Sequence, residues 1–165
     1  MIHPETRIGH VHLKVADLER AVAFYRDVLG FELMQRYGPQ AAFLSAGGYH
    51  HHIGLNTWQS QGAPQPPRRS TGLYHFAILL PNRRELARTL KRLLDHNWPI
   101  DGASDHGGSE AIYFRDPDGN GIEIYADRDP SQWPRQPNGE LMMVTQPLDL
   151  DGLLRTLDDE TPIAR

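Results

Sequence analysis

Apolar and polar residues alternate in several short runs of this sequence, and two longer runs carry apolar residues at helical spacing. Residues 8–15 alternate in the manner of a half-buried strand, and the apolar residues of the stretch 18–29 recur every three or four positions. Asp17 is a suitable N-cap for that helix, and Gly30 suits the position just after its end. Further strand patterns cover residues 31–37, 41–46 and 49–58. This part of the chain is therefore predicted to form a βαβββ module.

The same order of elements returns in the second half of the chain. Residues 74–80 form a strand pattern, and a helix with leucines at helical spacing is expected after the cap Asn82. Strand patterns then lie around Ile100, at residues 111–115 and at residues 122–126. His10 stands seven positions before Asp17, and His75 stands seven positions before Asn82. This spacing predicts an internal repeat of about sixty-five residues, with a histidine at the same point of each first strand.

These patterns predict an α+β protein with a single domain over residues 1–165. Its parts are a first module at 8–58, a linker at 59–71, a second module at 72–127 and a C-terminal tail at 128–165. The linker contains three prolines and no large core-forming residue. The tail is proline-rich with one short helix pattern near its end, and we expect it to pack on another subunit or on a partner.

Glu123 is the most unusual residue of the second module. It stands between Ile122 and Ile124 in the second strand of a predicted hairpin, whose turn is the sequence Asp-Pro-Asp-Gly-Asn-Gly at 116–121. An ionised carboxylate inside a sheet is costly unless a cation compensates it. Glu123 therefore faces either solvent or a metal ion.

Two imidazoles and one carboxylate on a rigid sheet form the ligand set typical of non-haem Fe(II) oxygenases, and Mn(II) or another divalent metal also fits it. His10, His75 and Glu123 are the candidate metal ligands. The alternative is that Glu123 is a solvated residue at a sheet edge and that both histidines only pack or face solvent.

The composition restricts the class of protein. Of 165 residues, 39% are apolar and 23% charged, as in ordinary globular proteins. The formal charge of −4 and the lack of a basic stretch argue against nucleic acid or a membrane surface as partner. The absence of cysteine excludes disulfides, thiolate metal sites and cysteine nucleophiles. No signal-peptide or membrane-spanning pattern is visible, which predicts a cytoplasmic protein.

Several motifs carry a family resemblance. They are Gly9-His10, Asp17-Leu18, Phe24-Tyr-Arg-Asp-Val-Leu-Gly-Phe31, Tyr74-His75-Phe76 and Asp116-Pro-Asp-Gly-Asn-Gly-Ile-Glu123. Over residues 8–127 the chain resembles the vicinal oxygen chelate superfamily, which includes glyoxalases, fosfomycin-resistance enzymes, bleomycin-binding proteins and extradiol dioxygenases. The resemblance implies paired βαβββ modules that form a curved mixed sheet around a divalent metal, with the helices outside. It also implies that His10, His75 and Glu123 bind that metal.

Within this superfamily the chain is most similar to the bacterial extradiol catechol dioxygenases that carry a Gly-Tyr-His-His-His-Ile run, found here at 48–53. The similarity implies a small aromatic diol and O2 as substrates. His52 then matches an acid/base histidine, Tyr113 a donor to a substrate oxygen, and His106 a histidine that contacts the catecholate. A neutral imidazole can accept a diol proton and return it, and a phenol can donate to an oxyanion.

Strand alternation adds two expectations about the other histidines. His50 and His52 should share one face of the strand 49–58, with His51 on the other. His12 shares the face of His10 and should line the cavity, either in contact with substrate or as a packing residue.

Other activities of the superfamily remain open. A glyoxalase-like lyase or isomerase normally adds a carboxylate from the last strand of the first module, but no Asp or Glu lies between Glu32 and Glu85. A fosfomycin-type transferase would need basic residues that grip a phosphonate, and a non-enzymatic small-molecule-binding protein usually lacks the ligands. The well-known extradiol enzymes are about twice as long, with four modules. We therefore expect a homodimer, whose site lies within one chain or across two.

Overall fold

A computed structural model describes residues 1–158 of the protein, in two compact units. The N-terminal unit comprises Met1–Gly72 together with Asp116–Gly119, and the C-terminal unit comprises Leu73–Arg115 and the described chain from Asn120 onward. Each unit holds one mixed sheet and a βαβββ succession of elements, so the α+β class and the two modules are confirmed. The assignment of both modules to a single domain stays a prediction. Across residues 1–158, no helix has both the length and the apolar character needed to cross a membrane.

The N-terminal unit is a four-stranded sheet in the order β1-β4-β3-β2. Its elements are β1 (Val11–Lys14), α1 (Leu18–Ala23), η1 (Phe24–Val28), β2 (Glu32–Tyr37), β3 (Ala41–Ser45) and β4 (Ile53–Asn56). β1 runs parallel to β4, and the remaining pairs are antiparallel. Leu13 and Val15 are buried, whereas His12 and Lys14, which alternate with them, are exposed. Alternation along β1 thus separates the core face from an open face.

The first helix differs in part from its prediction. Asp17 caps α1 as predicted, because its carboxylate accepts a hydrogen bond from the Arg20 amide at 3.0 Å. The α-helix ends at Ala23, and η1 continues as a π-helix, with the Leu29 amide bonded to the Phe24 carbonyl at 3.1 Å. The buried Tyr25 in this wider turn donates its hydroxyl proton to Asp116 at 2.9 Å.

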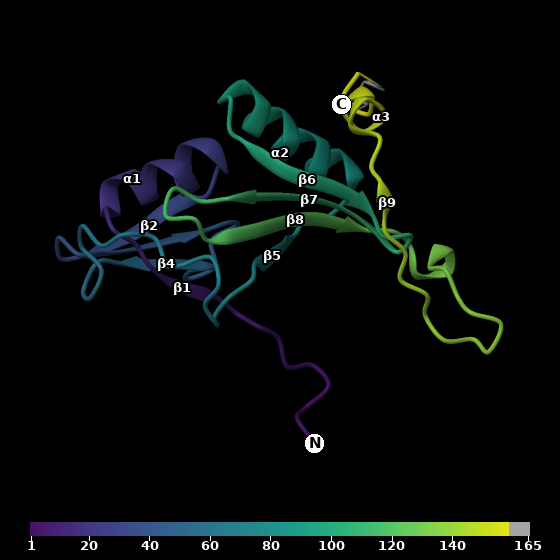
Figure 1. Cartoon of the computed structure of the whole chain (residues 1–165), viewed down its shortest axis with the longest axis horizontal. Coiled ribbons are helices and arrows are strands. Elements are labelled where there is room, and N and C mark those ends of the chain that lie inside the picture. The colour runs from purple at the N-terminus through teal and green to yellow at the C-terminus, as the bar shows by residue number, and fades with distance from the viewer. Residues whose placement is uncertain (159–165) are drawn as a thin grey trace. The chain divides into compact units, whose positions relative to one another are not determined.

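The C-terminal unit is a five-stranded sheet in the order β5-β8-β7-β6-β9. Its elements are β5 (Phe76–Leu79), α2 (Arg83–Asp95), β6 (Ile100–Asp105), β7 (Ser109–Arg115), β8 (Gly121–Asp127), η2 (Pro130–Gln132), β9 (Gln146–Pro147) and α3 (Leu150–Arg155). α2 covers one face of the sheet with its buried leucines, and α3 lies beside α2 (Figure 1). The predicted hairpin is present as β7 and β8.

Two predictions about strands need correction or addition. The strand expected at 49–58 begins only at Ile53, because Gly47 and Gly48 adopt positive φ values of 64° and 77° and turn the chain away from the ladder. The alternation argued for the three histidines before Ile53 therefore does not apply.

In the tail, the short helix is confirmed as α3, whereas η2 and β9 carried no sequence pattern that we recognised. Residues 159–165 of the predicted tail lie outside the described residues.

Candidate active site

The open face of the C-terminal sheet carries the polar residues of the second module. Ile112 and Ile124 are fully buried beneath α2, so the residues that alternate with them point to the opposite side. In the ladder, Glu123 faces Ala77 across the parallel pair and Tyr113 across the antiparallel pair. The strand register therefore places Tyr113 and Glu123 side by side on one open surface.

Glu123 has a histidine partner within its own unit. His75 immediately precedes β5, and its Nε2 lies 2.9 Å from Glu123 Oε2. The Glu123 side chain is only 14% exposed. The carboxylate is thus largely shielded from water and held against an imidazole, and its role as a metal ligand stays a prediction.

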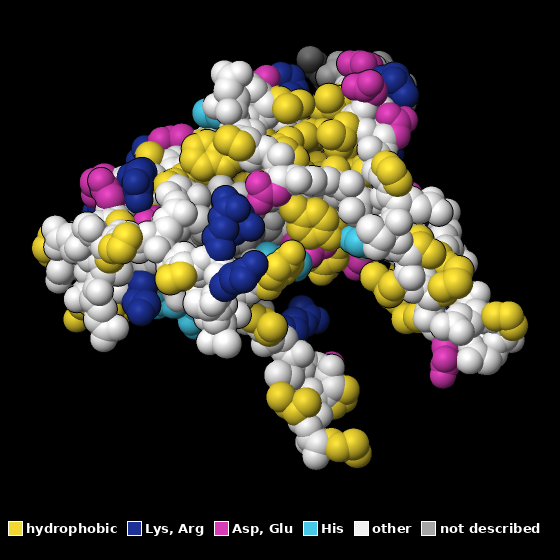
Figure 2. Space-filling model, in the orientation of Figure 1, with side chains coloured by type: hydrophobic (Ala, Val, Ile, Leu, Met, Phe, Trp, Pro, Cys, Tyr) yellow, Lys and Arg dark blue, Asp and Glu magenta, His cyan; other side chains and the backbone are white. Residues whose placement is uncertain are grey.

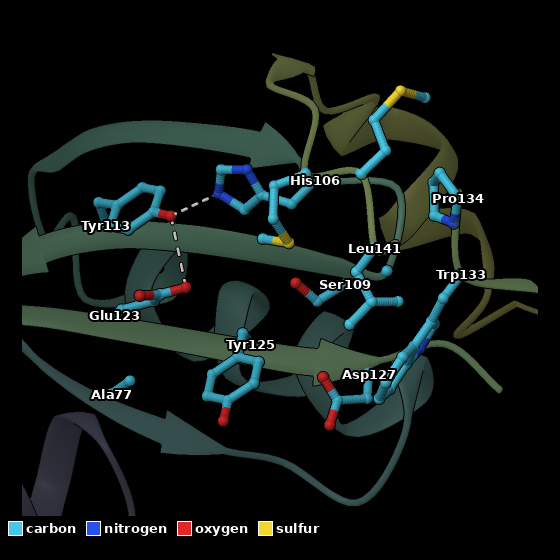
Figure 3. A pocket seen from close by; sticks show the side chains of 13 residues that line it. Ala77, His106, Ser109, Tyr113, Glu123, Tyr125, Asp127, Trp133, Pro134 and Leu141 are labelled. Atoms are coloured by element: carbon cyan, nitrogen blue, oxygen red, sulfur yellow. Dashed lines mark hydrogen bonds between the residues drawn. The ribbon is translucent and has the colours of Figure 1, made fainter. Parts of the chain in front are cut away.

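Tyr113 links Glu123 to His106. Its hydroxyl lies 3.3 Å from Glu123 Oε1 and 2.7 Å from His106 Nε2 (Figure 3). Burial, followed by the negative charge of Glu123, raises the pKa of Tyr113 to about 12. The phenol therefore stays protonated at neutral pH and can donate a hydrogen bond.

The tail fixes the orientation of the His106 ring. His106 Nδ1 lies 2.8 Å from the carbonyl oxygen of Val144. A carbonyl oxygen only accepts, so Nδ1 carries a proton, and Nε2 is the nitrogen that faces the Tyr113 hydroxyl. A backbone atom of the C-terminal segment thus decides which nitrogen of His106 faces the site.

An arginine supports the turn that carries His106. Arg128 binds both carboxylate oxygens of Asp105, at 2.8 and 2.7 Å, and also donates to the Gly107 carbonyl at 2.8 Å. It reaches the buried Glu110 at 3.1 Å as well. The hydrogen bond from Arg128 holds the pKa of Asp105 below its usual value. This network ties β6, β7 and the end of β8 together around His106.

A cavity of about 440 Å³ lies over this part of the C-terminal unit. Tyr113, Glu123 and His106 stand at one end of it, and Asp127 and Trp133 lie further along the sheet (Figure 3). Its remaining wall includes Pro134, Leu141, Met142 and Met143 of the C-terminal segment. The size is within the range of about 300–1,000 Å³ that is typical of small-molecule sites.

The other three candidate residues belong to the N-terminal unit. His10 is exposed and immediately precedes β1, as His75 precedes β5, which agrees with the predicted repeat. The His51 ring packs against it, with ring centroids 4.3 Å apart. His52 Nδ1 accepts the Ala46 amide proton at 3.2 Å and lies 3.1 Å from the Ser45 hydroxyl. Since a backbone amide only donates, the proton of the neutral His52 ring is on Nε2.

The strand registers identify the counterpart of Glu123 in the first module. Ala77 stands two residues after His75 and faces Glu123 in the C-terminal sheet. His12 stands two residues after His10 and faces Gly54 in the N-terminal sheet. The position where a carboxylate would complete a symmetric pair is therefore a glycine. The exposed ring of His12 lies directly over Gly54, where an added Cβ would come 2.9 Å from its Cγ.

The structure therefore brings four of the seven candidate residues together in one unit: His75, Glu123, Tyr113 and His106. His10, His12 and His52 lie in the other unit. Within residues 1–158, no three His, Asp or Glu side chains gather into a group that could hold a metal. The sequence reasoning missed Arg128, Trp133 and Val144, although the apolar run Leu-Met-Met-Val at 141–144 was a usable signal in a polar tail.

The chain belongs to the glyoxalase/bleomycin resistance protein/dioxygenase superfamily, whose family model matches residues 7–124. It is 45% identical over 160 residues to the catechol-2,3-dioxygenase of Bacillus subtilis (strain 168), covering 96% of this chain and 55% of that protein. It is 30% identical over 121 residues to the biphenyl-2,3-diol 1,2-dioxygenase 3 of Rhodococcus globerulus, covering 73% of this chain and 63% of that protein. The resemblance noted from the motifs is thereby confirmed, and the chain spans little more than half the length of these relatives.

Solved structures agree with this assignment. The lactoylglutathione lyase from Agrobacterium tumefaciens aligns with a TM-score of 0.58 and 26% identity, over 75% of this chain and 96% of that one. A glyoxalase/dioxygenase from Nostoc punctiforme aligns with a TM-score of 0.62 at 21% identity, over 78% of this chain and 97% of that one. The fold is therefore shared by enzymes with different chemistry, and the function must be argued from the site.

Proposed function

We propose that the protein is a metal-dependent extradiol dioxygenase that cleaves the ring of a catechol-like diol. The observation that carries this proposal is the row His75, Glu123, Tyr113 and His106, joined by distances of 2.9, 3.3 and 2.7 Å. The last three of these residues line one cavity. The row combines a candidate metal-binding pair with a protonated phenol and an oriented imidazole. The 45% identity to a catechol-2,3-dioxygenase supports the same reaction class.

His75 and Glu123 fit a divalent metal by their chemistry. An imidazole nitrogen and a carboxylate oxygen already lie 2.9 Å apart, and this ligand type suits Fe(II) or Mn(II). We propose His10 as the third ligand, supplied by the N-terminal unit of the same chain or of the second copy in a homodimer. When bound, the metal would supply Lewis acidity toward the diol and a path for electrons from the diol to O2.

The remaining residues handle protons and hydrogen bonds. Tyr113, protonated at neutral pH, donates to the diol oxygen that becomes negatively charged. His106 Nε2 lies 2.7 Å from the Tyr113 hydroxyl and holds that hydroxyl in place beside Glu123. We propose that His52 accepts a proton from the diol and returns it during ring opening.

The first module supports this choice over a lyase-like isomerase. The counterpart of Glu123 is Gly54, covered by the His12 ring, so that strand offers no carboxylate ligand. The paired His75 and Glu123 likewise make a non-enzymatic binding protein the weaker alternative, because a binder has no need for that pair.

The proposal is tested by loading the purified protein with Fe(II) under anaerobic conditions and then adding catechol and air. The expected result is a yellow ring-fission product. If no such product forms from any of several catechols, while the protein binds Fe(II), the dioxygenase assignment is wrong.

A further inference from the structure

We propose that Met142 and Met143 form a reversible oxidation site, at which hydrogen peroxide converts the thioether sulfurs to sulfoxides and detaches residues 141–145 from His106. In this reaction each sulfur gains one oxygen atom and is oxidised by two electrons, and the peroxide is reduced to water. A methionine sulfoxide reductase reverses the step. The proposed function would bring O2 to the same cavity, but the inference requires only hydrogen peroxide in solution.

The two methionines are adjacent in the sequence and accessible from solvent. They are 40% and 72% exposed, and both line the cavity of the C-terminal unit. Figure 2 shows hydrophobic side chains along this segment, at the right of the view. Because both side chains are in contact with water, dissolved peroxide reaches them while the protein stays folded.

The backbone that follows the methionines holds His106 at two points. The Val144 carbonyl oxygen lies 2.8 Å from His106 Nδ1, and the Val144 amide donates to the His106 carbonyl at 3.4 Å. The Thr145 hydroxyl lies 3.4 Å from the same ring nitrogen. A displacement of Met143 therefore passes through one peptide bond to the atoms that orient the His106 ring.

The same segment packs closely against the turn that carries His106. A Cβ added at Gly107 would lie 2.5 Å from Pro134 Cγ and 3.1 Å from Val144 Cγ2. The Met142 amide donates to the Pro134 carbonyl at 2.8 Å, so the methionine belongs to this contact as well. The contact depends on close packing and few hydrogen bonds, which a shift of the segment would break.

A sulfoxide fits this wall poorly. Its oxygen is a hydrogen-bond acceptor on a side chain that was apolar before oxidation. The cavity lining offers it no lysine or arginine, and Trp133 Nε1 already donates to the Arg128 carbonyl at 2.8 Å. Hydration by solvent then stabilises the oxidised side chains, since a polar group without a partner is costly to bury. This draws Met142 and Met143 outward and Val144 away from His106.

Met34 provides a matched control. It is 42% exposed on β2 of the N-terminal unit, so its access to peroxide is close to that of Met142. Leucine has a similar volume and lacks the sulfur. Met34→Leu and the double variant Met142→Leu/Met143→Leu therefore remove one oxidation site each with little change in packing.

The test treats the metal-free protein with hydrogen peroxide and locates the sulfoxides by mass spectrometry of its peptides. NMR of isotope-labelled histidine side chains reports which nitrogen of His106 carries the proton, and His106→Gln assigns the signals. We expect sulfoxides at Met142 and Met143, together with loss of the fixed Nδ1–H form of His106, in the wild type and in Met34→Leu. The double variant should keep this form, and a methionine sulfoxide reductase should restore it in the oxidised wild type.

The proposal is overturned if neither Met142 nor Met143 is oxidised, or if His106 is unchanged after both are oxidised. An equal change of His106 in the double variant would likewise overturn it, because the cause would then lie elsewhere. The experiment uses neither metal nor diol, so its failure does not affect the dioxygenase proposal. A failure of ring cleavage, conversely, does not affect the oxidation site.

Discussion

Gly54 lies beneath the imidazole ring of His12, across the parallel pair of β1 and β4. A Cβ at residue 54 would lie 2.9 Å from His12 Cγ and 3.0 Å from Nδ1. The position that carries Glu123 in the second module is therefore filled, in the first, by the ring of a neighbouring histidine. The repeat is symmetric in its strands and asymmetric in its chemistry.

Gly54→Ala should reduce the free energy of unfolding by about 1–2 kcal/mol, because the new methyl group displaces the His12 ring. Chemical denaturation measures this change. Gly102→Ala is the control, since no atom lies within 4 Å of a Cβ added there. The same Gly54 substitution in a His12→Ala background should cost little, and an undiminished cost in that background would show that His12 is not the obstacle.

Tyr113→Phe keeps the ring and removes the hydroxyl that lies between His106 and Glu123. We expect kcat to fall about 100-fold, since a donor to a developing oxyanion is lost. Steady-state kinetics of ring cleavage measure the effect, with Tyr37→Phe as the control on an exposed residue of β2. Equal rates for the Tyr113 variant and the wild type would remove Tyr113 from the mechanism.

Arg128→Met tests the network around the His106 turn through its pH dependence. Arg128 lowers the pKa of Asp105, so the pair stabilises the fold above the ordinary carboxyl pKa of 3.8 and loses this contribution as the pH falls. The free energy of unfolding of the variant should be about 2 kcal/mol lower than that of the wild type at neutral pH. This difference should shrink below about pH 4. Denaturation at several pH values measures both.

The exposed Lys91–Asp95 pair on α2 provides the control for this experiment. Lys91→Met should cost about 0.4 kcal/mol, because exposed helical ion pairs contribute little. If the loss of unfolding free energy in Arg128→Met does not vary with pH, Arg128 does not act on the pKa of Asp105.

Glu123→Gln tests the proposed metal ligand. The amide keeps the shape of the side chain and removes its charge, so metal bound after Fe(II) loading should fall to background in elemental analysis. Glu140→Gln, an exposed glutamate in the tail, should leave the metal content unchanged. Full metal content in the Glu123 variant would show that the ligand set is wrong.

The sequence predicted well those features that depend on neighbouring residues. The Asp17 cap, the β7–β8 hairpin and the repeat of His10 and His75 all follow from short-range patterns, and the structure contains each of them. The sequence also indicated that Glu123 needs a partner, because it stands between two buried isoleucines, and the structure places His75 beside it.

Other features depend on contacts that no local pattern contains. The Val144 carbonyl reaches His106 from 38 positions away in an irregular segment, so neither spacing nor propensity indicates it. The strand expected before Ile53 failed because two glycines with positive φ outweigh the strand propensity of the residues that follow them. The turn around Gly107 also could not be predicted from neighbouring residues, because Arg128, which donates to the Gly107 carbonyl, is 21 positions away.

The most direct test of the central claim uses isotopically labelled O2. The Fe(II)-loaded protein is mixed with catechol under labelled O2, and the products are examined by mass spectrometry. Ring cleavage by a dioxygenase predicts a ring-opened product that contains both atoms of one O2 molecule. A quinone without label, or unchanged catechol, would contradict the proposed function.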